Sequence, residues 1–291
     1  MNNHPTPPIF ETLQYKDSKF SLFKTFADKH PETIDIEQLI RMLKSEQCKD
    51  SIEKLRLCSD PAEKDRLKKG LPAVSVSGVF KDGRRAENIQ TYSALIQMDF
   101  DKLNNPESFK TELSKDPYTH LAFISPSGTG LKLIVKVSIN RVDHLENFKN
   151  LSVYFLNKYG ELPDKACKDV SRLMFLSYDP DLYFNQESLI WSNETALNSK
   201  FENVLNYIIR YSKFEKGNRN KFIFDLSLEC SAQNLKFEFV TSECLKRFQS
   251  EDFQKIEIQN SVESAYKYPA GYSAQTDPPI PRQTDPPKLS A

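Results

Sequence analysis

Residues 94–101 read Ala-Leu-Ile-Gln-Met-Asp-Phe-Asp, an apolar stretch that ends in two aspartates separated by one phenylalanine. A short apolar run of this kind is typical of a buried strand. Side chains two positions apart in a strand project to the same face, so Asp99 and Asp101 would lie about 7 Å apart. Phe100 would then point the other way, into the core. This strand and its two carboxylates decide both the fold and the function that the sequence predicts.

The segments around this strand predict an α+β fold. Asn105 is a good cap for a helix that begins near Pro106, and a glycine-containing turn separates two apolar stretches as in a hairpin. The order β-α-β-β-α-β describes a split αβ sandwich, related to ferredoxin-like and RNA-recognition-motif sheets. The predicted elements are strands over 71–80 and 94–101, a helix over 105–113, strands over 119–125 and 131–137, a helix over 142–159 and a strand over 172–178.

Changes in composition divide the 291 residues into four parts. The first part has apolar residues at helical spacing among many Lys and Glu residues. After the α+β core, a polar linker over 193–200 precedes a helical domain, and the final part repeats the pentapeptide Gln-Thr-Asp-Pro-Pro. The predicted domains are an N-terminal, partly helical extension over 1–69, the core over 70–195, a C-terminal helical domain over 201–268 and a low-complexity tail over 269–291.

Bulk composition excludes several classes of protein. Forty basic and forty acidic residues cancel, so any surface for nucleic acid must be local. The five cysteines are scattered without a CxxC motif, which argues against a zinc site or a disulfide scaffold. No stretch approaches the roughly 20 apolar residues of a membrane span, and no signal-peptide pattern is present. We therefore expect a cytoplasmic protein without a membrane partner.

The paired aspartates predict a divalent-metal site. Two carboxylates held close together repel each other unless a cation lies between them. Carboxylate oxygens suit Mg²⁺ or Mn²⁺, which take the rest of their ligands from water and substrate phosphates. The alternative is that Asp99 and Asp101 simply begin a loop, where aspartate is common.

A glycine turn follows the carboxylate strand in the chain. The stretch from Ser125 to Lys132 reads Ser-Pro-Ser-Gly-Thr-Gly-Leu-Lys. Such a turn can direct N–H groups and hydroxyls at a phosphate, and Lys132 adds a point charge. A tight hairpin whose glycines only serve the turn is the alternative. The candidate nucleotide-binding residues in this turn are Ser125, Ser127, Gly128, Gly130 and Lys132.

A third segment supplies another carboxylate and an arginine. Asp169 would complete the ligands of a second metal ion, and Arg172 would bind a phosphate through its planar fork. An ordinary ion pair between Asp169 and Arg172 is the alternative.

Taken in this order, the three segments resemble the archaeo-eukaryotic primase-polymerase superfamily, and within it the VirE N-terminal-type domains of bacterial mobile elements. The resemblance covers about residues 70–190. It implies that Asp99, Asp101 and Asp169 are catalytic and hold the metal ions, and that the glycine turn binds the incoming nucleotide. The superfamily commonly has a histidine where this chain has Lys132, and lysine cannot do the proton transfer of an imidazole. The stretch Gly217-Asn-Arg-Asn220 is similar to the start of a primase C-terminal helical domain.

The resemblance implies a metal-dependent nucleotidyltransferase of primase or DNA polymerase type, part of a mobile-element replication system. Its partners would be nucleoside triphosphates, a single-stranded or primed DNA template and a separate helicase. Two alternatives remain open at this point. One is a catalytically inactive nucleic-acid-binding replication module, and the other is a glycosyltransferase that uses a DxD motif, Mn²⁺ and a nucleotide sugar.

Overall fold

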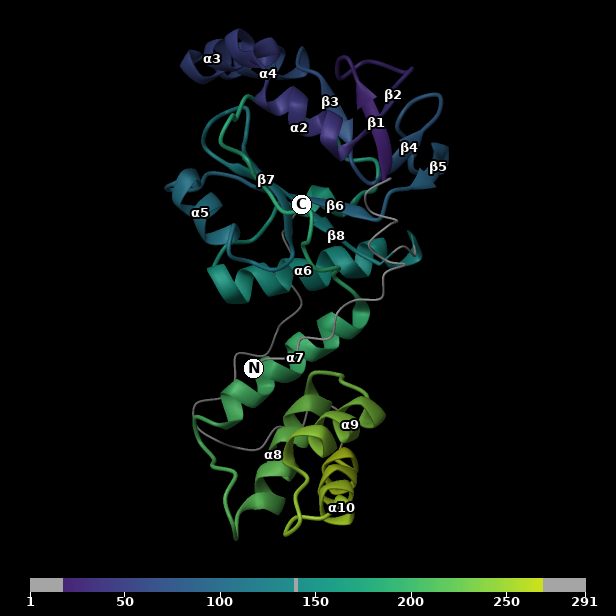
Figure 1. The fold of residues 1–291 in the computed structure, drawn as a ribbon, viewed down its shortest axis with the longest axis vertical. Helices are drawn as coiled ribbons and strands as arrows, with labels where there is room; N and C mark the ends of the chain where they lie inside the picture. Colours follow the sequence, from purple (N-terminus) through teal and green to yellow (C-terminus); the bar gives the residue numbers. More distant parts are fainter. Residues whose placement is uncertain (1–17, 139–140, 269–291) are drawn as a thin grey trace. The chain divides into compact units, whose positions relative to one another are not determined.

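The computed structural model describes residues 18–138 and 141–268, and the chain divides into two compact units, Met1–Asn193 and Glu194–Ala291 (Figure 1). The first unit combines helices with antiparallel sheets, and the second is helical. This confirms the α+β class. The tail predicted over 269–291 lies outside the described residues. Within the described ranges, no helix combines the length and the apolar character that crossing a membrane requires.

A four-stranded antiparallel sheet contains the carboxylate strand. Its strands follow the order β10-β7-β8-β6, and helix α5 joins β6 to β7 while β8 lies between them (Figure 1). This is a split β-α-β arrangement, and it confirms the three strands and the helix predicted here. The elements are β6 (Leu95–Phe100), α5 (Pro106–Leu113), β7 (Thr119–Ile124), β8 (Leu131–Lys136), α6 (His144–Tyr159) and β10 (Tyr183–Phe184).

The two faces of this sheet have different neighbours. The Phe100 ring packs against Phe109 of α5 and Phe155 of α6, with ring centroids 5.2 and 5.8 Å apart. Helices α5 and α6 therefore cover that face. Because alternate side chains point to opposite faces, Asp99 projects to the other face, as the sequence predicts for residues flanking Phe100.

A second four-stranded sheet, in the order β2-β1-β3-β9, is built largely from the N-terminal segment. The sequence predicts the helices of this segment but not the strands β1 and β2. Asp35 ends β2 and caps α2 by accepting a hydrogen bond from the Gln38 N–H, at 2.8 Å. The elements are β1 (Lys19–Phe23), β2 (Glu32–Asp35), α2 (Ile36–Lys44), α3 (Lys49–Leu57), α4 (Pro61–Lys69), β3 (Ala73–Ser75) and β9 (Met174–Phe175).

Two strand predictions differ from the structure. The stretch 71–80 is not one strand, because a turn at residues 76–77 divides it into β3 and β4 (Gly78–Phe80), and β4 pairs with β5 (Ile89–Tyr92). The stretch 172–178 contributes only the two-residue β9, which pairs with β3 instead of joining the sheet of β6. The edge position next to β7 is taken by β10. A period-two pattern predicts extended backbone but does not identify its partner strand.

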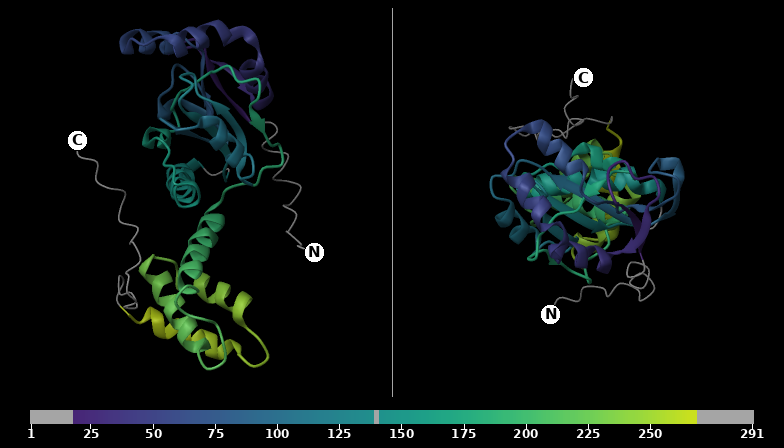
Figure 2. Two further views of the ribbon diagram at one scale, coloured as in Figure 1. Left: turned by 90° about the vertical axis from the view of Figure 1, so that its left-hand side faces the viewer. Right: turned by 90° about the horizontal axis from the view of Figure 1, so that it is seen from above.

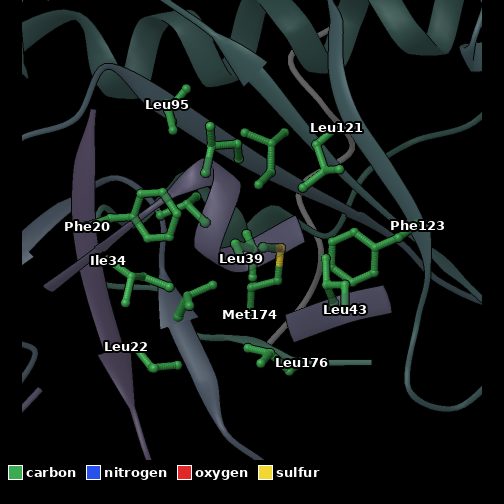
Figure 3. Close-up of a cluster of buried hydrophobic side chains, with 14 of the residues drawn as sticks. Phe20, Leu22, Ile34, Leu39, Leu43, Leu95, Leu121, Phe123, Met174 and Leu176 are labelled. Carbon is green, nitrogen blue, oxygen red and sulfur yellow. The ribbon is translucent and has the colours of Figure 1, made fainter. Parts of the chain in front are cut away.

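One hydrophobic core joins the two sheets (Figure 3). Phe20 and Leu39 of the N-terminal segment pack in the same cluster as Leu121 and Phe123 of β7. Met174 of β9 belongs to it as well, and each of these five side chains is at most 1% exposed. The N-terminal segment therefore covers the face of the β6 sheet to which Asp99 projects.

The described part of the second unit, up to residue 268, contains four helices, which can be followed in Figures 1 and 2. Residues 193–200, predicted as a polar linker, form the first half of α7, so that prediction is wrong. Asn, Glu, Ser and Lys are acceptable on the exposed face of a helix. The other face of α7 carries the buried Ala196 and Phe201, and Phe201 belongs to the hydrophobic core of the second unit. The helices are α7 (Asn193–Ile208), α8 (Arg219–Ala232), α9 (Phe237–Phe248) and α10 (Lys255–Tyr266).

Candidate functional site

The two aspartates of the carboxylate strand have different surroundings. Asp99 is 7% exposed, and its Oδ2 lies 2.7 Å from Nζ of Lys132, its direct neighbour on β8. Its Oδ1 is also buried but makes no hydrogen bond to any described residue. Asp101 follows the end of β6 and is exposed. A buried carboxylate oxygen without a donor is unusual, and it makes this position a candidate ligand site.

The glycine turn packs directly against the end of the carboxylate strand. A Cβ atom on Gly130 would lie 2.5 Å from the carbonyl oxygen of Phe100 and 3.3 Å from Cα of Asp101. Only glycine allows this approach. Gly128 has a φ of +76°, which also favours glycine. The structure thus brings the turn together with Asp101 and, through β8, with Lys132.

Hydrogen bonds inside the turn use groups that the sequence assigns to a phosphate. The Gly128 N–H donates to the Ser125 carbonyl at 2.9 Å, and the Gly130 N–H donates to Ser125 Oγ at 3.2 Å. Ser127 Oγ lies 3.0 Å from Ser125 Oγ and 3.1 Å from Thr129 Oγ1. The glycine N–H groups are therefore occupied. Thr129 is exposed, and its hydroxyl, which contacts that of Ser127, is the polar side-chain group of the turn most open to an anion.

An arginine that sequence reasoning missed supports the turn. Arg56 of α3 donates from Nε to the Pro126 carbonyl and from Nη2 to the Ser125 carbonyl, both at 3.4 Å. A Cβ atom on Gly128 would lie 3.3 Å from Arg56 Nε. These contacts span about 70 residues of sequence, so no local pattern could have indicated them.

The third segment is arranged differently from the prediction. Asp169 is exposed, and its Oδ1 accepts hydrogen bonds from the N–H and Oγ of Ser171, both at 2.9 Å. Arg172 pairs with Asp164, not with Asp169, at 3.0 Å. The Asp164 N–H donates to the Asp99 carbonyl at 2.7 Å, so this loop lies against the carboxylate strand.

The predicted set of three aspartates is not assembled as a metal centre. Among the described residues, no group of three or more His, Cys, Asp or Glu side chains has the arrangement of a metal site. The role of Asp169 as a third ligand therefore stays a prediction. The donor set that does fit a divalent cation is the pair Asp99 and Asp101, because Asp99 Oδ1 is unpartnered and Asp101 is accessible.

Two side chains next to Asp99 on this face, Gln97 and Cys167, carry no charge. Gln97, two residues earlier on the same face, directs Nε2 to Sγ of Cys167 at 3.8 Å. Burial, and then the charge of Asp99, raise the pKa of the Cys167 thiol to about 12. Cys167 thus stays protonated and is a poor metal ligand at neutral pH.

Lys68, on α4, is a second residue that sequence reasoning missed. Desolvation first, and then the charge of Lys132, lower its pKa from the usual value. The charges of Asp101 and Asp99 act in the opposite direction. These electrostatic influences associate Lys68 with the candidate site.

Comparison with known proteins adds a family-level likeness. Residues 66–184 match the family model described as BT4734-like, N-terminal domain. This span contains the carboxylate strand, the glycine turn and the third segment, and it is less than half of the chain.

Among solved structures, the chain is similar to the one titled "Crystal structure of primase RepB′". The identity is 10%, the TM-score is 0.30, and the alignment covers 89% of this chain and 93% of that one. A likeness at this level supports no conclusion about function. No curated protein matches the chain.

Proposed function

We propose that the chain is a divalent-metal-dependent nucleotidyltransferase of primase or DNA polymerase type. The observation that carries the proposal is the buried, unpartnered Oδ1 of Asp99 beside the exposed Asp101, against which the Gly130 turn packs. The order of these segments in the sequence resembles the primase-polymerase superfamily. The VirE-type assignment, the mobile-element setting, the primase C-terminal character of α7–α10 and a separate helicase remain parts of this proposal.

Each site residue has a role that follows from its position. Asp99 and Asp101 would hold Mg²⁺ or Mn²⁺, which when bound activates the 3′-hydroxyl and stabilises the leaving pyrophosphate. Lys132 and Arg172 would neutralise phosphate oxygens of the incoming nucleotide. The hydroxyls of Ser125, Ser127 and Thr129 line the turn beside them. Asp169 stays a predicted third ligand.

A second candidate function rests on Lys132. Its ammonium lies 2.7 Å from Asp99 Oδ2, so a positive charge already neutralises this carboxylate. A cation held by the protein itself would reduce the need for a metal ion. The chain would then bind nucleotides or nucleic acid without transferring nucleotides.

Primer extension separates the two candidates. A primed DNA template is incubated with nucleoside triphosphates and Mg²⁺ or Mn²⁺, using the wild type and Asp101→Asn. Because Asp101 is exposed, this change should leave the fold intact. Loss of a metal ligand should cost at least the 10- to 100-fold that supporting residues of metal sites typically contribute.

Binding of Mn²⁺, measured by isothermal titration calorimetry, gives a readout independent of turnover. Glu112→Gln, on the exposed face of α5 away from the site, is the matched control and should bind Mn²⁺ and extend primers as the wild type does. Extension that is lost only in Asp101→Asn supports the enzyme. Nucleotide or DNA binding without extension in the wild type supports the second candidate.

A further inference from the structure

Two cations beside the candidate site have no carboxylate partner. Nζ of Lys68 lies 5.6 Å from the ring centroid of Phe175, and the guanidinium carbon of Arg84 lies 4.6 Å from that of Phe26. Neither side chain forms an ion pair or hydrogen bond with any residue in the described ranges. Both charges are therefore available to an external anion.

The charge of Arg172 acts on both of these cations. Desolvation first, and then the charge of Arg172, lower the pKa of Arg84. The charge of Arg172 also contributes to lowering the pKa of Lys68. Like charges held together raise the free energy of the unliganded protein, and a bound anion relieves this repulsion. Lys68, Arg84 and Arg172 thus form a cluster of cations, and the charges of Asp99 and Asp101 on Lys68 and of Asp169 on Arg84 act in the opposite direction.

An exposed aromatic ring lies beside Arg84. Phe26 is 41% exposed, and its N–H donates to the Lys69 carbonyl at 3.2 Å, which fixes its loop against the end of α4. Arg84 approaches the ring at 4.6 Å and Nζ of Lys69 at 5.8 Å. An exposed ring with cations beside it is the arrangement on which unpaired bases stack while phosphates contact the charges.

We propose that Phe26, Lys68 and Arg84 form a binding surface for single-stranded nucleic acid that leads into the candidate site. The proposal rests on the nucleic-acid substrate of the function proposed above. Lys68 and Arg84 would contact the phosphodiester backbone, and Phe26 would stack on a base.

The combination favours a single strand over the other phosphate-bearing ligands. A nucleoside triphosphate needs the charges near Lys132 but has no use for an aromatic ring beyond Arg84. A duplex offers phosphates, but its bases are paired and stacked and cannot reach Phe26. Cations and an accessible ring together are typical of proteins that bind single strands without sequence preference.

Fluorescence anisotropy with a labelled 20-nucleotide oligothymidylate tests the proposal. The full chain is titrated at several salt concentrations with EDTA present, so that neither a metal ion nor turnover is involved. The double variant Lys68→Ala/Arg84→Ala should bind at least tenfold more weakly. The slope of log affinity against log salt should become shallower by about 1.4, since each phosphate contact on a single strand contributes about 0.7. Phe26→Ala should weaken binding about tenfold with an unchanged slope.

The matched control is Lys115→Ala. Lys115 lies just after the end of α5, is exposed and forms no ion pair with any described residue. It should change neither affinity nor slope. Equal affinity and slope for the double variant and the wild type would overturn the proposal, and so would equal effects of Phe26→Ala on single-stranded and duplex DNA. Loss of nucleoside triphosphate binding with oligonucleotide binding intact would assign the cations to the nucleotide instead. Asp101→Asn should bind the oligonucleotide normally, so failure of catalysis and failure of this surface give different results.

Discussion

Two buried lysine–aspartate pairs in the α+β unit share the same chemistry but differ in what surrounds them. Asp99 is 7% exposed and Asp179 is 5% exposed. Their partners are equally close, since Nζ of Lys132 lies 2.7 Å from Asp99 and Nζ of Lys110 lies 2.9 Å from Asp179. Burial and pairing alone therefore do not tell the two apart.

The difference lies in the remaining lone pairs of each carboxylate. Oδ2 of Asp179 also accepts a hydrogen bond from the Ile124 N–H at 2.8 Å, and Oδ1 accepts from Lys110 at 3.1 Å and the Asp181 N–H at 3.2 Å. Oδ1 of Asp99 accepts none in the described part of the chain. We call Lys110–Asp179 the closed pair, because hydrogen bonds occupy both carboxylate oxygens and make it a structural link. Lys132–Asp99 is the open pair, because Asp99 keeps one oxygen for a ligand.

The largest expected effect is on the closed pair. Asp179→Asn places an amide NH₂ group against donors whichever way it turns, because both carboxylate oxygens accept hydrogen bonds. It also leaves Lys110 without its buried counter-charge. We expect the free energy of unfolding to fall by about 3–5 kcal/mol. Urea denaturation monitored by the fluorescence of Trp191, the chain's one tryptophan, reports on this unit.

Asp181→Asn is the control for that change. Asp181 is exposed and contributes only its backbone N–H to the pair, so its substitution should stay within about 0.5 kcal/mol of the wild type. A loss of stability in Asp179→Asn no larger than that of the control would show that the pair is not a structural link.

Asp99→Asn should be milder and should act on the ligand. Both substitutions leave a buried lysine without its counter-charge, so the difference between them comes from the new amide. In Asp99→Asn the amide oxygen can still accept the hydrogen bond from Lys132, and the NH₂ group can take the place of Oδ1, where no donor lies. We expect the free energy of unfolding to fall by about 1–3 kcal/mol less than in Asp179→Asn, together with loss of Mn²⁺ binding in calorimetry. If Asp99→Asn destabilises the fold as much as Asp179→Asn does, Oδ1 of Asp99 is engaged within the fold and both pairs are structural.

The sequence predicts the open pair's strand but not its environment. The apolar content of residues 94–101 predicts β6. The close packing of Gly130 against Asp101 gives a physical reason for a glycine in the turn. Arg56, which contacts the glycine turn, and Lys68, whose pKa responds to the charges of the site, come from helices far away in the chain. Helical spacing predicts those helices but not which sheet they cover.

The position of Asp169 shows the same limit. Its side chain is held by the N–H and hydroxyl of Ser171, a local turn that competes with any distant partner. The place next to the carboxylate strand goes to Asp164, whose backbone N–H reaches the Asp99 carbonyl. Loop aspartates a few residues apart are equivalent as a sequence pattern, and only the path of the chain separates them.

Replacing each lysine with methionine sharpens the contrast through metal affinity. Lys132→Met removes the cation that shares Asp99 with an incoming ion, so the dissociation constant for Mn²⁺ should fall at least tenfold, about 1.4 kcal/mol. Lys110→Met exposes no carboxylate of the site and should leave the Mn²⁺ affinity unchanged. Calorimetric titration of both variants measures this directly. Equal Mn²⁺ affinities in Lys132→Met and the wild type would mean that Lys132 and the metal ion do not compete.

The smallest effect concerns alkaline pH and the closed pair. Burial acts to lower the pKa of Lys110, but its hydrogen bonds and ion pairs with Asp179 and Glu107 outweigh this and raise the pKa above its usual value of 10.5. A lysine whose pKa is higher in the folded state stabilises the fold fully below its unfolded pKa, and this contribution is lost as the pH rises through the folded pKa. The free energy of unfolding of the wild type should therefore fall above about pH 10.5 more steeply than that of Lys110→Met. Urea denaturation followed by Trp191 fluorescence from pH 9 to pH 11.5 measures the difference in the free energy of unfolding between the two proteins. Tyrosines titrate in both proteins, so their contribution cancels in this difference. A constant difference across this range would mean that the folded state does not hold the Lys110 proton more tightly than the unfolded chain does.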